Sequence, residues 1–186
     1  MDRCPWASTE PELSYHDTEW GIPAYDPRVL FEFLVLEAAQ AGLSWRTVLI
    51  KRENYSRHYA DWDIDRVCAY GAADVDQMLA DPGLIRNRAK ILASIELAQI
   101  IQRFGPEAFA EYLWSFVGGA PRINHLSIQS EIPAQTPEAE AMSRALKKLG
   151  ARFVGPTICY AFMQAVGMVD DHLVTCPRHT ENRGKG

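Results

Sequence analysis

Apolar residues recur at helical spacing along most of the chain, and the pattern is clearest between Asp26 and Gly42. The apolar positions in this stretch repeat every three or four residues: Leu30, Leu34, Ala38 and Ala41. Such a repeat places the apolar side chains on one face of a helix. Asp26 is a suitable N-cap, Pro27 suits the first helical position and Gly42 suits the end. The sequence therefore predicts a helix between these limits.

Similar patterns predict four further helices, over residues 86–104, 106–117, 137–149 and 156–167. No segment alternates strictly between apolar and polar residues with turn signals at its ends, so strands are expected to be incidental. The segment 118–135 is rich in Gly, Pro, Asn and Ser, and we predict a loop or lobe boundary there. The prediction is an all-α single domain over residues 1–186, with the terminal segments in one lobe and the central helices in the other.

Composition agrees with one folded domain, because 186 residues with 47% hydrophobic and 23% charged side chains can bury a core without disulfides. The first residues lack the apolar run of a secretory signal, and no apolar stretch reaches the ~20 residues of a membrane span. We expect a cytoplasmic protein with no membrane partner. The net charge of −5 argues mildly against a nucleic-acid partner, since phosphate binding depends on Lys and Arg.

Cysteine and histidine form two pairs near opposite ends of the sequence, Cys4 with His16 and His172 with Cys176. The spacing of His172 and Cys176 would place both side chains on one face of a helix, as in many metal sites. Four such ligands complete the tetrahedron that zinc prefers, so a zinc ion here would be structural and would join the two chain ends. The alternative, that all four are ordinary buried residues, remains open at this point. Two further cysteines lack a histidine at ligand spacing and are predicted to be core residues: Cys68 and Cys159.

Glu37 lies on the apolar face of the predicted helix 26–42, where an ionised carboxylate is costly to bury. A buried carboxylate acquires a raised pKa or a specific set of donors, and both are typical of functional sites. The alternative is that Glu37 lies at the edge of this face and reaches water. Aromatic residues surround it in the sequence, with planar surfaces that suit either a flat ligand or the core: Trp6, Tyr15, Trp20 and Trp45.

The segment from Leu149 to Thr157 joins two predicted helices through a short turn bounded by glycines, which is typical of a helix-hairpin-helix. Backbone N–H groups at such a turn, here those of Gly155 and Thr157, bind phosphate without reading base sequence. Basic residues surround the turn and also occur upstream: Arg144, Lys147, Lys148 and Arg152, and Arg86, Arg88 and Lys90. The acidic residues concentrate between residues 61 and 81, so the net charge does not describe the basic segments. The alternative is that the cations only stabilise a helix C-terminus.

Several short motifs are spread in order over residues 3–176. They are Arg3-Cys4-x-Trp6, Tyr15-His16-Asp17-x-Glu19-Trp20-Gly21, Leu36-Glu37, Gln40-Ala41-Gly42-Leu43-Ser44-Trp45, Arg86-Asn87-Arg88-Ala89-Lys90, Phe153-Val154-Gly155-Pro156-Thr157 and Asp171-His172. In this order they closely resemble the DNA-3-methyladenine glycosylase I family of bacteria. The resemblance implies an all-α helix-hairpin-helix glycosylase that hydrolyses the N-glycosidic bond of 3-methyladenine in alkylated double-stranded DNA. It also implies the first step of base excision repair, and we expect the protein to be a monomer.

The resemblance further implies one structural zinc ion per chain, held by Cys4, His16, His172 and Cys176, which agrees with the pairing above. It assigns roles to the remaining site residues: Glu37 recognises the extruded base, Tyr15 hydrogen-bonds it, Trp45 stacks on it, Trp6 and Trp20 line the pocket, and Leu43 and Gln40 contact DNA, with Leu43 in the gap left in the duplex. Together with the hairpin residues Lys147, Arg152, Gly155 and Thr157, these form the expected DNA interface.

Two positions depart from the family pattern. The wider helix-hairpin-helix glycosylases carry a catalytic Asp where this family usually has Asn, and this chain has Asp170. Either Asp170 is a benign exchange, or it adds the carboxylate of the broader superfamily and strengthens hydrolysis. The segment 10–14 before Tyr15 is one residue shorter than the usual pattern and lacks its aromatic residue. The resemblance therefore does not predict which residues form that part of the pocket wall.

Two other functions compete with the glycosylase. One is a DNA-damage-binding module without catalysis, although such a module would not need Glu37 together with pocket aromatics. The other is a hydrolase with catalytic zinc, which requires an open coordination position that four protein ligands would fill.

Overall fold

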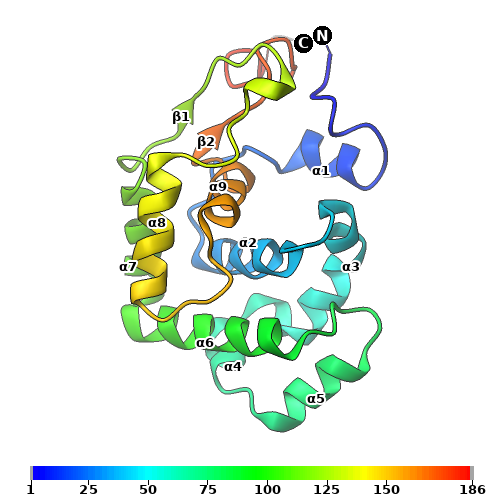
Figure 1. Cartoon of the computed structure of the whole chain (residues 1–186), viewed down its shortest axis with the longest axis vertical. Coiled ribbons are helices and arrows are strands. Elements are labelled where there is room, and N and C mark those ends of the chain that lie inside the picture. Colours follow the sequence, from blue (N-terminus) through cyan, green and yellow to red (C-terminus); the bar gives the residue numbers. More distant parts are fainter. Residues whose placement is uncertain (1, 185–186) are drawn as a thin grey trace.

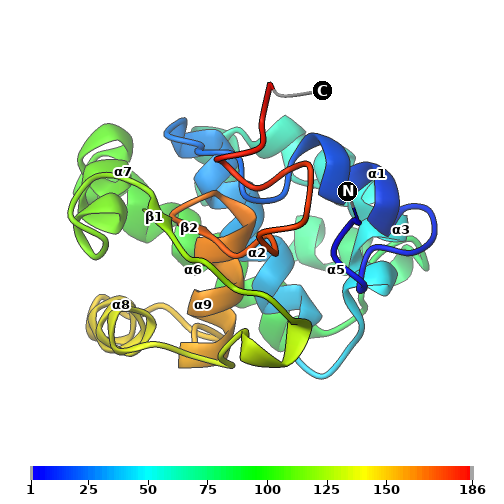
Figure 2. The ribbon, with the colours of Figure 1, turned by 90° about the horizontal axis from the view of Figure 1, so that it is seen from above.

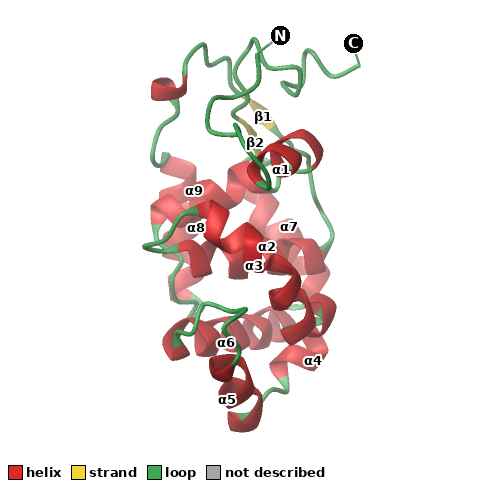
Figure 3. Cartoon of the chain, turned by 90° about the vertical axis from the view of Figure 1, so that its right-hand side faces the viewer, coloured by secondary structure: helices red, strands yellow, loops and turns green. Residues whose placement is uncertain are grey.

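Helices make up most of the structure, a computed structural model that describes residues 2–184 (Figure 3). They are α1 (Glu12–Thr18), α2 (Pro27–Gln40), α3 (Trp45–His58), α4 (Ile64–Cys68), α5 (Ala72–Ala80), α6 (Arg88–Phe104), α7 (Pro106–Ser115), α8 (Pro137–Lys148) and α9 (Pro156–Ala165), with the 3-10 turns η1 (Ala60–Trp62) and η2 (Gln129–Glu131). Two short strands, β1 (Arg122–Ile123) and β2 (Val169–Asp170), pair in parallel. The prediction of a mainly helical fold with incidental strands is confirmed.

The helices that the sequence predicted, α2, α6, α7, α8 and α9, agree with their predicted limits to within two residues at each end. Asp26 caps α2 by accepting a hydrogen bond from the Arg28 N–H at 2.7 Å. Asn87 caps α6 in the same way, by accepting from the Lys90 N–H at 3.1 Å. Gly42 follows α2 with φ of +81°, a conformation that favours glycine and ends the helix.

The sequence patterns did not identify α1, α3, α4 and α5. Helix α3 shows the reason, because only Val48 and Tyr55 of its residues are buried and its apolar stripe is therefore weak. It begins where Ser44 accepts a hydrogen bond from the Thr47 N–H at 3.2 Å. Helices α4 and α5 are short and bury two residues each. Such helices depend on packing against neighbours more than on their own pattern.

Helix α2 lies at the centre of the molecule and packs against α3, α6, α7 and α9 (Figure 1). Its side chains are buried on several faces, and Phe31 and Leu36 are fully inaccessible. The N-terminal and C-terminal segments lie near each other at the end of the molecule opposite α5 (Figures 1 and 2). One hydrophobic cluster extends from Cys4 to Cys176, so both terminal segments share the core with the central helices.

Helices α8 and α9 form a hairpin through a turn over residues 149–155. Gly150 has φ of +98°, and the buried Ser143 hydroxyl donates to the Val154 carbonyl at 2.6 Å, which holds the turn against α8. Among residues 2–184, no helix combines the length and apolar character needed to cross a bilayer.

Candidate active site and metal centre

A cavity of about 220 Å³ lies beside the C-terminal half of α2. Aromatic side chains from the N-terminal segment, α1 and α3 line it: Trp6, Tyr15, Trp20 and Trp45. The other lining residues come from α2, from the η2 region and from α9: Glu37, Gln40, Gln129, Ile132, Ala161 and Gln164. The structure thus brings Glu37 and Gln40 together with the four aromatic residues that the sequence singled out.

The aromatic side chains support one another. The Trp6 and Trp20 rings meet edge to face, with centroids 5.0 Å apart at 74°. The Tyr15 and Trp45 rings are tilted by 54° with centroids 5.3 Å apart. Such arrangements are favourable for aromatic pairs, and all four rings belong to residues that line the cavity. The cavity therefore suits a planar, polarisable ligand.

Glu37 is 3% exposed, so the interpretation that it reaches water at the edge of its helix is wrong. Its Oε2 atom has no hydrogen-bond partner among the described residues. Burial raises the pKa of Glu37 from its ordinary value near 4.5 to about 8. A carboxyl group with this environment favours a ligand that supplies hydrogen-bond donors or a positive charge.

Two further buried polar atoms beside Glu37, the Tyr15 hydroxyl and the Trp45 Nε1, have no partner among residues 2–184. Buried polar atoms are nearly always hydrogen-bonded, so three unpartnered atoms around one cavity indicate groups that a ligand completes. Burial, followed by the charge of Glu37, raises the pKa of Tyr15 well above its ordinary value, so its hydroxyl remains a proton donor. The cavity thus offers one acidic group and two neutral donors.

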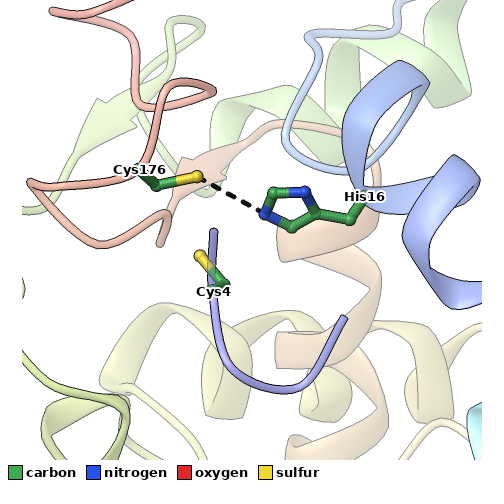
Figure 4. Close-up of side chains that lie close together, drawn as sticks. All are labelled: Cys4, His16 and Cys176. Atoms are coloured by element: carbon green, nitrogen blue, oxygen red, sulfur yellow. Dashed lines mark hydrogen bonds between the residues drawn. The ribbon is translucent and has the colours of Figure 1, made fainter. Parts of the chain in front are cut away.

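A second cluster of polar side chains joins the two ends of the chain. The ligand atoms of Cys4, His16 and Cys176 all lie within 4.8 Å of one another, and all three residues are buried (Figure 4). Cys176 Sγ and His16 Nε2 are 3.5 Å apart. The Nε2 atom of His172 is buried without a partner, and its ring lies 4.9 Å from that of His16 between centroids. Two thiols and an imidazole nitrogen are donors typical of structural zinc, so these three residues fit a bound metal ion, while the His172 Nε2 atom is not among the atoms that lie within 4.8 Å of one another.

Both histidines are oriented by carboxylates. His16 Nδ1 lies 2.8 Å from Asp17, and His172 Nδ1 lies 2.8 Å from Asp170, which leaves each Nε2 available as a ligand. Hydrogen bonds from the Cys4 thiol and from His16 lower the pKa of the Cys176 thiol, and so favour the thiolate that binds metal. Gly21 allows the close approach, because a Cβ atom there would lie 2.7 Å from His172 Cε1.

One premise of the metal prediction was wrong. His172 and Cys176 do not share a helix face, because α9 ends at Ala165 and the segment that carries them consists of loops and turns. Leu173 pairs there with Leu126 in a bridge, and the Cys176 N–H donates to the Leu173 carbonyl at 2.7 Å. A tight turn, rather than helical periodicity, places Cys176 in the cluster with Cys4 and His16.

Asp170 is buried beside His172 and is not one of the residues that line the cavity. Its Oδ1 accepts from the His172 backbone N–H at 3.1 Å and lies 2.8 Å from the His172 ring, while its Oδ2 accepts from the Thr180 N–H at 2.7 Å. Although burial opposes ionisation, the hydrogen bonds from His172 and Thr180 lower the pKa of Asp170. Both oxygens are therefore occupied by the chain itself.

The residues expected at the DNA interface lie in different environments. Leu43 is 43% exposed, in the turn between α2 and α3, and Lys147 and Thr157 are exposed at the ends of the hairpin helices. Gly155 precedes α9, whose N-terminus has no side-chain cap. Arg152 instead forms a two-point ion pair with Glu96, at 2.8 and 2.9 Å.

Four lining residues were absent from the predicted site: Gln129, Ile132, Ala161 and Gln164. Gln164 had a sequence signal, since it interrupts the apolar stretch 158–169. The sequence grouped Lys90 with the basic residues Arg86 and Arg88, and its Nζ in fact donates to the carbonyls of Ala39 and Ala41, at 2.9 and 2.7 Å. Only the packing of α6 against the end of α2 reveals that contact.

Comparisons with known proteins agree with this geometry. Residues 6–179 match the family model described as methyladenine glycosylase. The chain is 46% identical to DNA-3-methyladenine glycosylase 1 of Escherichia coli K12, over 98% of this chain and 100% of that protein. A crystal structure of 3-methyladenine DNA glycosylase I superposes with a TM-score of 0.93 at 47% identity, covering 96% of this chain and 100% of that one. A crystal structure of a tyrosine-to-phenylalanine variant of 3-methyladenine DNA glycosylase I, in complex with 3-methyladenine, superposes with a TM-score of 0.89 at 34% identity. The match covers 96% of this chain and 98% of that one. The chain therefore belongs to the methyladenine glycosylase family of enzymes.

Proposed function

We propose that this protein is a monomeric, monofunctional DNA glycosylase that hydrolyses the N-glycosidic bond of 3-methyladenine in alkylated double-stranded DNA. The observation that carries the proposal is the buried Glu37, whose unpartnered carboxyl oxygen lies beside an aromatic cavity. The family relatives support it, because two of the similar solved structures are named for 3-methyladenine complexes or recognition. The reaction would be the first step of base excision repair.

Cleavage of this glycosidic bond requires little from the protein beyond recognition of the base. Methylation at N3 gives the base a positive charge in the nucleotide, and its departure as a neutral molecule relieves that charge. Burial disfavours the ionised form of Glu37 in the ligand-free pocket, whereas a cationic base stabilises it. Hydrogen bonds between the Glu37 carboxylate and the amino edge of the base strengthen in the water-poor cavity. Recognition that is strongest in the transition state is itself catalysis.

The remaining pocket residues position the base. Trp45 provides the surface on which the base stacks, and the Tyr15 hydroxyl provides a hydrogen-bond donor. Trp6 and Trp20 close the wall behind them. Extraction of a nucleotide from the duplex costs a few kcal/mol, and a damaged base lowers that cost.

The surface around the cavity would hold the duplex in a helix-hairpin-helix manner. Leu43 projects from the turn beside the cavity and would fill the gap that the extruded nucleotide leaves, next to Gln40. Uncapped N–H groups at the start of α9, near Gly155 and Thr157, would bind phosphate together with Lys147. Arg152 would have to leave Glu96 to do the same.

We further propose that Cys4, His16, His172 and Cys176 hold one zinc ion. With four protein ligands the ion is structural, and it supplies cross-linking of the chain ends rather than a water nucleophile. Asp170 then serves to orient His172, because its oxygens bond to His172 and Thr180 and not to the cavity. The base-binding residues alone perform recognition.

The decisive experiment is incubation with methylated DNA, followed by chromatography of the released bases. We expect the wild-type protein to release 3-methyladenine, and Glu37→Gln to release at least a hundredfold less, because the amide cannot accept a charge-assisted hydrogen bond in the same way. Near wild-type release by Glu37→Gln would exclude this role for Glu37. No release by the wild-type protein over a range of salt concentrations, with retained DNA binding, would favour the damage-binding module.

A further inference from the structure

Gln164 is a polar side chain of α9 that lines the base cavity and is anchored from behind by a buried carboxylate. Its Nε2 donates to Asp171 Oδ2 at 2.7 Å. Asp171 is 1% exposed and also accepts from the Tyr160 hydroxyl and from Asn124 Nδ2, each at 2.6 Å. The carboxylate therefore acts as acceptor toward three neutral donors, two from α9 and one from the segment after β1.

This anchoring determines which atom of Gln164 remains for a ligand. A carboxylate accepts hydrogen bonds, so the Gln164 amide must turn its nitrogen toward Asp171. The amide oxygen is then the polar atom of Gln164 that remains available to a ligand in the cavity. An unanchored glutamine could rotate to offer either atom, whereas this one offers only an acceptor.

We propose that Gln164 is a specificity-determining residue that presents a fixed acceptor to the base, and that Asp171 is its positioning residue. The inference rests on the proposed function and deepens it. Gln164 then adds a fixed acceptor to the cavity that Glu37 also lines. This acceptor favours a base that presents an amino group and disfavours a base that presents a carbonyl oxygen in its place, because two facing acceptors are left desolvated and unpaired.

The test compares Gln164→Met with the wild-type protein in binding two free bases, 3-methyladenine and its oxo counterpart 3-methylhypoxanthine. Calorimetry or the fluorescence of the pocket tryptophans measures both dissociation constants. We expect the wild-type protein to prefer the amino base by about tenfold or more, the equivalent of one hydrogen bond. In Gln164→Met, affinity for the amino base should fall about fivefold to tenfold, while affinity for the oxo base stays equal or rises.

An equal loss of affinity for both bases would overturn the proposal, because it would mean that the side chain only packs or rotates freely. Changes of less than twofold in both affinities would overturn it as well. In Gln164→Met, Asp171 still accepts hydrogen bonds from Tyr160 and Asn124, so the fold should persist. Measurements of the thermal unfolding midpoint and of the metal content verify this. Release of 3-methyladenine from DNA by the wild-type protein tests the proposed function separately, so an unchanged ratio in an active enzyme overturns only this inference.

Gln99→Met is the matched control. Gln99 is a partly buried glutamine on α6 whose Nε2 donates to the Cys68 carbonyl at 3.1 Å, and it does not line the base cavity. Its replacement removes a hydrogen bond of the same kind. The affinity ratio for the two bases should equal that of the wild-type protein.

Discussion

At the scale of single residues, the buried position of Glu37 links function to stability. Its pKa is about 8 in the folded protein and about 4.5 in an exposed glutamate. Between these two pH values the unfolded chain releases the proton while the folded chain retains it. The free energy of unfolding therefore falls as pH rises through this window, by up to about 1.4 kcal/mol per pH unit.

Glu37→Gln removes this ionisation, so the stability of the variant relative to the wild-type protein should grow as pH rises. Urea unfolding at pH 5 and pH 8 measures the difference, and we expect the gap to widen by a few kcal/mol in favour of the variant. Glu53→Gln, at an exposed position on α3, should show no such widening. A gap that does not change with pH would show that Glu37 ionises normally in the free protein.

Asp170 leads to a different prediction, because its carboxylate faces His172 and Thr180 rather than the cavity. In Asp170→Asn, single-turnover excision per metal-loaded molecule should remain within about twofold of wild type, while metal affinity falls about tenfold to a hundredfold. A large loss of excision rate at full metal occupancy would instead restore the catalytic role.

At the scale of elements, the end of α2 is capped by a side chain from another helix. The last carbonyls of a helix have no partner within it, and α2 has no basic residue in its last turn. Lys90 on α6 supplies both the donors and the charge through its bonds to Ala39 and Ala41. These carbonyls flank Gln40 and directly precede the turn that carries Leu43.

We expect Lys90→Met to lower the free energy of unfolding by about 1–2 kcal/mol and to weaken binding to DNA, because the turn between α2 and α3 loses its support. Binding of free 3-methyladenine should change much less, since Glu37 lies one turn earlier in α2. Urea unfolding, DNA titration and base titration measure the three effects.

Lys51→Met is the control for that variant. Lys51 is half-buried and also donates to a backbone carbonyl, that of Pro82 at 2.6 Å, but in an exposed hydrogen bond away from the cavity. It should lose less than ~0.5 kcal/mol and keep its DNA affinity. Equal behaviour of the two variants would contradict a special role for Lys90.

The elements also show how far the sequence could predict the fold. Helices α2 and α6 were predictable, because caps and an apolar stripe specify their limits locally. Helix α3 was not, since it buries only Val48 and Tyr55 and its apolar stripe is therefore weak. The cavity follows the same rule. Residue type alone indicated that Glu37 and the aromatic residues belong to the site. In contrast, Gln129 and Ile132 line the cavity only because the segment after β1 folds over it.

At the scale of the whole molecule, the chain ends and the base cavity form one unit. Trp6, Tyr15 and Trp20 line the cavity and lie in the same terminal segment as the proposed ligands Cys4 and His16. The other ligands come from the C-terminal segment, more than 150 residues later. A metal ion there closes a very long loop, which removes much of the conformational freedom of the unfolded chain.

Atomic spectroscopy of the purified protein should therefore find one zinc ion per chain, and its removal by a chelator should act on stability and on base binding together. We expect the free energy of unfolding to fall by several kcal/mol and 3-methyladenine affinity to fall at least tenfold, because the aromatic wall is no longer held. Addition of zinc should restore both properties, and magnesium should not, since thiolates bind it poorly.

Two serine variants separate the metal from the core. Cys176→Ser removes a ligand and should reproduce the chelator effect, whereas Cys68→Ser changes a half-buried cysteine whose thiol faces the Asp65 carbonyl at 3.2 Å and should keep its metal and its base affinity. Thermal unfolding, metal content and base titration are measured on both. If Cys176→Ser lost its metal yet bound 3-methyladenine as tightly as the wild-type protein, the core alone would hold Trp6, Tyr15 and Trp20 in place, and the chain ends would serve stability without serving the pocket.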